Sequence, residues 1–494
     1  MRPFPPARRK PGRSFRVATF FIHNFGCRAT QADASAIGLD LKAHGYAAAE
    51  SDRAAEFVVL NTCTVTAAAD AQARDAVRRI RRENPGARIV VTGCYAQRAP
   101  EELAALEGVS WVIGNSHQSA LPSIISRVEN TCVEDARTDF IPLGRLSSAS
   151  HSARIFRGEA ASMKEVLIAA PDATDDRTRP TLKIQDGCNH RCSYCVIPLV
   201  RGRSRSLASA RAVAEIRRLV DAGAREIALS GIDLGSYGRD LSPRTSFQEL
   251  IRQILCETSL ERLRLSSIEP MDVTQDFIDL VASTDRIAPH FHMPLQSGSD
   301  RILRAMHRWY RAAHYARRVE LIRERLPHAA IGADVITGFP GETEEDHAAT
   351  LRFLEELPFS YLHVFSFSPR PGTEAAALGE HVPLSVIHRR ARELRAMALR
   401  KLTAFRAAQN GAALHVLTLG RQGTDWTEAL SGNYLKLRVR GLWPRNEWLD
   451  VIFSDRDSAL EPTPAAGSAL AFQDDLRERQ ISTVRDGKQD AFCS

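Results

Sequence analysis

The stretch Arg179-Pro-Thr-Leu-Lys-Ile-Gln-Asp-Gly-Cys188-Asn-His-Arg-Cys192-Ser-Tyr-Cys195 joins a short strand pattern to three closely spaced cysteines. Their C-x3-C-x2-C spacing suits a soft metal bound by thiolates, and iron–sulfur is the leading candidate. Three local ligands leave one metal position open for a substrate or cofactor, whereas four would close the site. A zinc site completed by a distant Cys or His is the alternative, although zinc sites usually use paired C-x2-C units.

Further strand patterns follow this stretch, and each ends in small or polar residues. They occupy 226–230, 262–267, 289–292, 330–336 and 361–365. With the strand before Cys188 they make six strand–helix units, which are typical of a full or partial β/α barrel whose active site lies at the carboxyl ends of its strands. The candidate ligand contacts at these strand ends are Ser230, Gly231, Glu269, Gln296, Asp334 and Arg370. Capping a loop or forming a hydrogen bond within the barrel is the alternative role for each of them.

The N-terminal part repeats a pattern of strand, cysteine and helix. Nearly apolar runs at 17–22, 57–60 and 88–92 lead to Cys27, Cys63 and Cys94. Such runs are expected for parallel strands buried on both faces, and helical segments lie between them. The pattern predicts a Rossmann-like α/β unit. Because parallel strands share one carboxyl edge, the three cysteines are expected to converge there.

The C-terminal part shows short alternating strands with turn signals, which fit a small β-barrel. The span 431–446 contains basic and aromatic residues and no acid, namely Tyr434, Lys436, Arg438, Arg440, Trp443 and Arg445. Interleaved basic and aromatic side chains suit a nucleic-acid surface. A polar strand face turned to water is the alternative.

The composition is that of an ordinary globular protein with more than one domain. The chain has 494 residues, 44% hydrophobic and 25% charged, with a formal net charge of +7 that permits an acidic partner such as nucleic acid. Nine cysteines are too sparse for a disulfide scaffold. The sequence shows no secretory signal and no apolar run of about 18 residues, so we expect a cytoplasmic protein without a membrane span.

These patterns divide the chain into consecutive regions. We expect a basic disordered arm (1–14), an α/β domain (15–135), a linker (136–177), a barrel (178–405), a small β-barrel (406–472) and a tail (473–494).

Taken together, the motifs resemble a known family. Cys188-x3-Cys192-x2-Cys195 at the head of a barrel resembles the radical S-adenosylmethionine (SAM) enzymes. Preceded by a three-cysteine α/β domain and followed by a small β-barrel, it resembles the methylthiotransferases over about residues 15–465. In that family the last barrel is the TRAM domain, an RNA-binding module.

The family has three main branches. Two act on adenosine 37 of tRNA, carrying either an N6-isopentenyl or an N6-threonylcarbamoyl group, and one acts on an aspartate of a ribosomal protein. Three stretches are most similar to the threonylcarbamoyl branch: Asn61-Thr-Cys63-Thr-Val-Thr66, Thr92-Gly-Cys94-Tyr-Ala-Gln97 and Leu234-Gly-Ser-Tyr-Gly-Arg-Asp240. Phe25-Gly-Cys27-Arg-Ala-Thr-Gln31 departs from that branch's commoner Gly-Cys-Lys-Val-Asn-Gln and leaves the branch open.

The resemblance implies two [4Fe–4S] clusters, SAM and a radical reaction at C2 of the adenine. Cys188, Cys192 and Cys195 would hold the catalytic cluster, whose open iron binds SAM. Cys27, Cys63 and Cys94 would hold a second cluster that carries the sulfur. The cofactor contacts would be Tyr194, Ser230, Gly231, Glu269, Gln296, Asp334 and Arg370.

The implied partners are the tRNA anticodon loop and an electron donor such as flavodoxin or ferredoxin. The isopentenyl substrate and the ribosomal-protein aspartate are the alternative substrates for the same reaction. A non-catalytic iron–sulfur or zinc RNA-binding module is the alternative from a different functional class.

Overall fold

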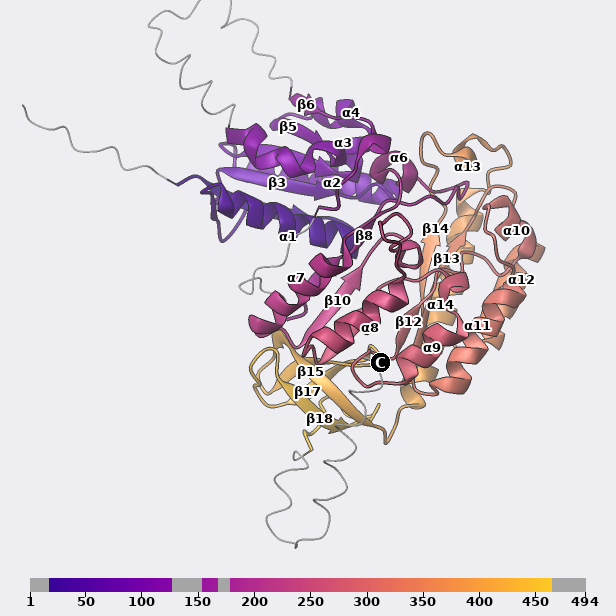
Figure 1. Cartoon of the computed structure of the whole chain (residues 1–494). Coiled ribbons are helices and arrows are strands. Elements are labelled where there is room, and N and C mark those ends of the chain that lie inside the picture. The colour runs from indigo at the N-terminus through magenta and orange to yellow at the C-terminus, as the bar shows by residue number, and fades with distance from the viewer. Residues whose placement is uncertain (1–16, 127–152, 168–177, 464–494) are drawn as a thin grey trace, which may run out of the picture.

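The computed structural model describes residues 17–126, 153–167 and 178–463 (Figure 1). In Figure 1 the N-terminal sheet lies at the top, the central strands and their helices lie below it, and the C-terminal sheet lies at the bottom. The predicted arm (1–14) and tail (473–494) lie outside the described residues.

The N-terminal sheet is parallel throughout, with strand order β2-β1-β3-β4-β5-β6, which confirms the Rossmann-like prediction. Its central strand β3 is buried along its whole length, as its apolar sequence requires. The strands are β1 (Thr19–Asn24), β2 (Ala47–Ala48), β3 (Phe57–Thr62), β4 (Arg88–Gly93), β5 (Val109–Gly114) and β6 (Arg154–Phe156). The helical segments are α1 (Arg28–Ala43), α2 (Ala67–Glu83), α3 (Cys94–Arg98), α4 (Pro100–Ala104) and the 3-10 helix η1 (Asn115–Ala120).

Strand β6 lies inside the predicted linker (136–177) and was missed by the sequence pattern. It pairs in parallel with β5, with Trp111 opposite Arg154. Because β6 has only three residues, its sequence shows no alternation that could identify a strand. The 3-10 helix η3 (Ala160–Ser162) follows it.

The central region is a partial β/α barrel. Its two parallel sheets have the orders β11-β10-β7 and β12-β13-β14, and a parallel bridge between Leu263 and Ile287 links them. The barrel strands are β7 (Thr181–Lys183), β10 (Glu226–Ser230), β11 (Arg262–Leu265), β12 (His290–His292), β13 (Ala330–Thr337) and β14 (Tyr361–Ser366). The predicted barrel is thereby confirmed.

Helices cover the outside of these strands. Ile227, Leu229 and Val335 join the large hydrophobic core formed with the helices, and the alternate residues of the same strands face the opposite, inner face. The helices of this region, of which α6 packs instead against the N-terminal α3, are α6 (Ile197–Arg201), α7 (Ser209–Asp221), α8 (Phe247–Glu257), α9 (Gln275–Ala282), α10 (Asp300–Ala305), α11 (Ala312–Arg325), α12 (Glu344–Glu356), α13 (Glu374–Ala377) and α14 (Leu384–Ala407). Short elements complete the region: β8 (Gln185–Asp186), β9 (Arg205–Ser206), η4 (Leu234–Ser236) and η5 (Pro270–Asp272).

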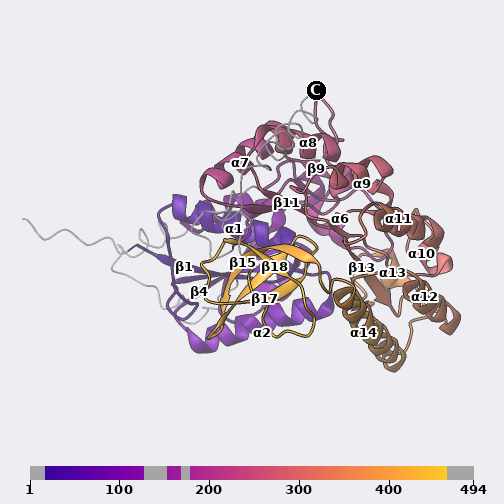
Figure 2. The same cartoon turned by 90° about the horizontal axis from the view of Figure 1, so that it is seen from below.

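The C-terminal region is a small antiparallel barrel with strand order β17-β16-β15-β18. Leu460 bridges Val439 on one edge strand, and Pro462 bridges Val451 on the other, so the segment that contains them closes the sheet as predicted. In the view from below, this sheet lies in front of the N-terminal strands β1 and β4 (Figure 2). The strands are β15 (Ala413–Gln422), β16 (Trp426–Ser431), β17 (Lys436–Arg440) and β18 (Trp448–Ile452).

The helices in the described part of the chain are amphipathic or short. None of them combines the length and the apolar character that crossing a lipid bilayer requires.

Candidate active site

Three cysteines meet at the carboxyl edge of the N-terminal sheet. Cys27 caps α1, Cys63 directly follows β3, and Cys94 is the first residue of α3 after β4. Cys63 and Cys94 are buried, whereas Cys27 is exposed. Burial, together with the nearby Cys94 and Cys27 thiols, raises the pKa of the Cys63 thiol to about 12. The predicted convergence is therefore present in the structure.

Two glycines form the turns that deliver these cysteines. Gly26 and Gly93 have φ values of 120° and 96°, a region that side chains with a Cβ rarely adopt. A Cβ on Gly26 would lie 2.5 Å from Cβ of Cys63, and one on Gly93 would lie 2.6 Å from the backbone nitrogen of Thr62. Both turns therefore require glycine to bring the thiols together.

The second cysteine group lies in the loop after β8, at the head of the barrel. The Cys188 Sγ accepts a hydrogen bond from the His190 backbone N–H at 3.4 Å, and the Cys195 N–H donates to the Cys192 carbonyl at 3.0 Å. Burial, together with the Cys192 thiol beside it, raises the pKa of Cys195 to about 12. The three thiols are thus held together by one tight loop.

A positively charged side chain reaches this loop from another part of the barrel. Arg308 donates to the Cys192 Sγ at 3.3 Å and pairs with Glu269. Burial raises the pKa of Glu269, and Arg308 counteracts that rise. Glu269 therefore contacts the cysteine loop through Arg308, a residue that the sequence pattern did not identify.

His190, inside the loop, is held by an acid. Its Nε2 lies 3.0 Å from Oδ2 of Asp233, and its ring meets Trp309 edge to face at 4.2 Å. The hydrogen bond with Asp233 raises the pKa of His190. Ligand atoms of Cys188, His190 and Asp233 lie within 4.8 Å of one another, so a zinc ion there would use only one of the three cysteines.

The other predicted contacts lie near the cysteine loop or at strand ends. Tyr194 packs against a small hydrophobic core of Ile302, Met306, Phe339 and Ala375. The Ser230 carbonyl accepts a hydrogen bond from the Ile184 N–H at 2.9 Å, and a Cβ on Gly231 would lie 3.0 Å from Oε1 of Gln185.

Gln296 has a backbone conformation that is rare for a residue with a side chain. Its φ of 68° lies in the left-handed region, and it forms a bridge with Val335 near the carboxyl end of β13. Such conformations persist where surrounding structure enforces them, and they cluster at ligand sites. The rare backbone conformation therefore favours the prediction that Gln296 belongs to the ligand site.

Two of the predicted cofactor contacts, Arg370 and Asp334, are paired with other protein side chains. Arg370 donates to Asp70 at 2.9 Å and to the Thr64 carbonyl at 3.2 Å, so it ties the loop after β14 to the N-terminal domain beside Cys63. Asp334 accepts from His292 at 3.0 Å and from His363 at 3.1 Å on the inner face.

The inner face carries histidines that the sequence analysis did not select. His292 and His363 face Asp334, and the Tyr361 hydroxyl lies 2.8 Å from His290 Nε2 and 2.9 Å from His292 Nδ1. The strand alternation contained the signal, because His290 and His292 are two residues apart in one strand and Tyr361 and His363 in another.

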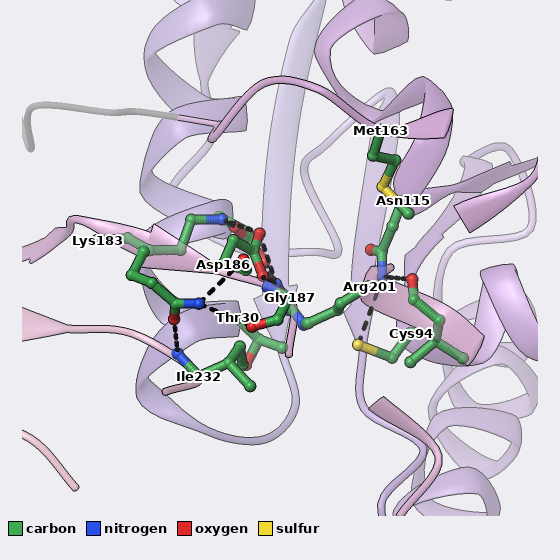
Figure 3. A network of polar contacts seen from close by, with 12 residues as sticks. Thr30, Cys94, Asn115, Met163, Lys183, Asp186, Gly187, Arg201 and Ile232 are labelled. Atoms are coloured by element: carbon green, nitrogen blue, oxygen red, sulfur yellow. Dashed lines mark hydrogen bonds and ion pairs between the residues drawn. The ribbon is translucent and has the colours of Figure 1, made fainter. Parts of the chain in front are cut away.

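A buried ionic network joins the N-terminal cysteines to the barrel (Figure 3). Asp33 of α1 pairs with Lys183 of β7 and with Arg201 of α6, the latter at 2.8 Å. Asp186 completes the network at 2.9 Å from Lys183 and 3.0 Å from Arg201. Burial raises the pKa of Cys94, and the charge on Arg201 opposes that rise, so the network lies close to the N-terminal thiols.

The basic span of the C-terminal barrel is only partly free. Glu428 lies 3.2 Å from Lys436, Glu461 lies 2.6 Å from Arg440, and Arg438 covers the ring of Trp426. Tyr434, an aromatic of the predicted nucleic-acid surface, instead stacks on His290 at 4.4 Å, because its turn packs against the central barrel, where Arg264 donates to the Ser431 and Gly432 carbonyls.

The donor set fits two open clusters. Each group offers three thiols, and within the described residues neither group contains a fourth cysteine. Three thiolates leave one iron of a cube without a protein ligand.

Comparison with known proteins agrees with this geometry. Residues 182–354 match the radical SAM superfamily, and residues 19–114 match the uncharacterized protein family UPF0004. The solved structure of the radical SAM methyltransferase TsrM from Kitasatospora setae, with cobalamin and a [4Fe–4S] cluster, superimposes with a TM-score of 0.52 at 16% identity, covering 73% of this chain and 74% of that one. The central region is thus a radical SAM fold.

Similar curated proteins narrow the class. The threonylcarbamoyladenosine tRNA methylthiotransferase MtaB of Bacillus subtilis is 37% identical, covering 77% of this chain and 80% of the relative. The protein of the same name from Aquifex aeolicus is 35% identical over 85% of this chain and 96% of the relative. The tRNA-2-methylthio-N(6)-dimethylallyladenosine synthase of Paenarthrobacter aurescens is 34% identical over 84% of this chain and 77% of the relative.

The chain belongs to the radical SAM methylthiotransferase family. It is therefore an enzyme that uses SAM and two [4Fe–4S] clusters.

Proposed function

We propose that this enzyme adds a methylthio group to C2 of N6-threonylcarbamoyladenosine at position 37 of tRNA. The observation that carries the proposal is the pair of three-cysteine groups, one at the edge of the N-terminal sheet and one at the head of the barrel. Methylthiolation needs both activation of a C–H bond and delivery of sulfur, and two open clusters suit these two tasks. The two MtaB relatives support the threonylcarbamoyl substrate.

We assign the cysteine groups separate roles. Cys188, Cys192 and Cys195 hold the cluster that, with SAM bound, supplies a 5′-deoxyadenosyl radical. Cys27, Cys63 and Cys94 hold the cluster that carries the sulfur.

The remaining assignments concern the ends of the barrel strands. Ser230 and Gly231 let the backbone approach the SAM amino group, and Glu269 and Gln296 provide polar contacts for SAM. Tyr194 packs beside the barrel cluster. Asp334 orients His292 and His363, and Arg370 holds the N-terminal domain against the barrel.

The small barrel is proposed to be a TRAM domain that binds the tRNA around its anticodon loop. Lys436, Arg438 and Arg440 are exposed on one strand of this barrel, and phosphate contacts would displace their weak surface ion pairs. An electron donor such as flavodoxin or ferredoxin would reduce the barrel cluster, and the reaction would take place in the cytoplasm. The domain limits are proposed at 15–135, 178–405 and 406–472.

Nucleoside mass spectrometry of tRNA from a strain lacking this enzyme tests the proposal. We expect 2-methylthio-N6-threonylcarbamoyladenosine to disappear and to return on complementation with the wild-type chain, but not with Cys188→Ala. Loss of the isopentenyl analogue instead would contradict the proposed substrate. That second candidate has support from the dimethylallyladenosine synthase relatives at 34% to 36% identity.

A further inference from the structure

Arg28 carries a charge that no acid in the described residues neutralises. It directly follows Cys27 as the first residue of α1, and its Nη2 donates to the Tyr434 hydroxyl at 3.1 Å. Its Nη1 is buried and has no hydrogen-bond partner. A buried donor without a partner is costly, and more so on a charged group. An anionic ligand would supply both the partner and the missing counter-charge.

The surroundings of Arg28 continue onto the inner face of the barrel. Tyr434 stacks on His290 at 4.4 Å with 24° between the rings, and His290 Nε2 lies 2.8 Å from the Tyr361 hydroxyl. His290 Nδ1 is also buried without a partner. Burial and the charges of Arg264 and Arg28 lower the pKa of His290 well below its usual value, so its ring is neutral. Two unsatisfied nitrogens from different domains thus lie near one tyrosine.

The nearby charges are unbalanced in the positive direction. Among the described residues, one carboxylate, that of Glu226, is shared by Arg264 at 2.7 Å, Arg179 at 3.3 Å and Arg262 at 3.6 Å. Arg264 also lies 5.4 Å from the centre of the Tyr434 ring, on which Arg28 packs at 5.8 Å. Asp334, an acid on the same inner face, already pairs with His292 and His363. The excess positive charge favours a small anion over a cation or an apolar group.

Resting on the proposed function, we propose that Arg28 binds the carboxylate of the N6-threonylcarbamoyl group while C2 of the same adenine faces the cysteines. Arg28 lies next to Cys27, so the substituent and the sulfur-carrying site would be neighbours. A guanidinium pairs with a carboxylate through a planar fork of two hydrogen bonds. An isopentenyl group has no charge and would leave the buried Nη1 unpaired. Sites built for a polar group reject analogues that lack it, so Arg28 determines specificity.

Comparing the acid with its neutral ester tests this proposal directly. The holoenzyme would be titrated with fluorescent anticodon stem-loops whose residue 37 is threonylcarbamoyladenosine, its methyl ester, or isopentenyladenosine. We expect the wild-type enzyme to bind the acid about 10- to 100-fold more tightly than the ester, as one charge-assisted pair implies. Arg28→Met should bind acid and ester equally, and Arg28→Lys should keep part of the preference.

The controls separate recognition from cluster loss. Arg82→Met removes an exposed arginine of the same domain and should keep the full preference for the acid. Iron and sulfide contents show whether Arg28→Met still assembles both clusters. If it does not, the comparison of acid and ester in the wild-type and Arg28→Lys enzymes still tests the proposal. Equal affinity of the wild-type enzyme for acid and ester, or an undiminished preference in Arg28→Met, would overturn the inference.

A different result would contradict the proposed function itself. In that case the wild-type enzyme would form no methylthio product on the threonylcarbamoyl stem-loop. If product forms but acid and ester bind alike, the proposed function stands and only the assignment of Arg28 is wrong.

Discussion

Arg308 shows how one side chain links a barrel strand end to the cysteine loop. It is buried, it contacts Cys192 and Glu269, and its charged head lies over the ring of Tyr310 at 4.9 Å. Hydrogen bonds and positive charge near a cluster sulfur stabilise the reduced cluster and raise its reduction potential.

Replacing Arg308 with Met should therefore lower the potential of the barrel cluster, by an amount on the order of tens of millivolts. Potentiometric titration followed by EPR measures this shift. Arg304→Met, which removes an exposed arginine from α10, serves as the control and should leave the potential unchanged. A potential unaffected by Arg308→Met would show that this contact does not influence the cluster.

At the scale of elements, the turns between strands and helices hold the cysteines in place. Gly93→Ala would force a Cβ against Thr62 and Asn61 at a φ of 96°. We expect a loss of about 2–4 kcal/mol in the free energy of unfolding, together with loss of the N-terminal cluster. Gly45→Ala has a similar φ but open space around it, so it should cost about 1–2 kcal/mol and leave iron content unchanged. Urea unfolding and iron analysis distinguish the two variants.

The sequence predicted these elements where the pattern was local. Apolar strands ending in cysteine placed Cys27, Cys63 and Cys94 at one edge, because parallel strands leave few alternatives. The partners of Arg370 could not be predicted, since Asp70 lies 300 positions away in the sequence and only the docking of two domains brings them together. The inward position of Tyr434 has the same cause. Its turn has the sequence of a surface turn, and only the packing of the two barrels against each other stacks its ring on His290.

At the scale of the whole molecule, buried charges connect the domains. Asp33→Asn would leave Lys183 and Arg201 with Asp186 as their remaining shared acid in the network. Removing one partner from a buried network costs about 3–5 kcal/mol. We expect faster amide exchange in α1 and in the strands beside it, measured by mass spectrometry. Asp75→Asn, at an exposed pair with Arg78, should show no such change.

Glu226 gives the fold a dependence on pH. Burial alone would raise its pKa, but Arg264, Arg179 and Arg262 outweigh burial and lower it. A lowered folded-state pKa means that the stabilisation is present above the unfolded-state pKa and is lost as pH falls through the folded-state value. Glu226→Gln should therefore lower the free energy of unfolding by about 3–5 kcal/mol at pH 7. The difference in the free energy of unfolding between wild type and variant should become smaller below about pH 4.

Urea unfolding at several pH values measures this difference. Glu320→Gln, at an exposed pair with Arg317, should stay within about 0.5 kcal/mol of wild type throughout. A difference for Glu226→Gln that became larger in acid would contradict the assigned direction.

Iron and sulfide analysis after anaerobic reconstitution tests the two-cluster account most directly. The wild-type chain should hold about eight iron and eight sulfide, as two cubes require. Replacing Cys188, Cys192 and Cys195 together with Ala should leave about four of each, and so should replacing Cys27, Cys63 and Cys94. Iron content that stayed at the wild-type level in either triple variant would contradict the account.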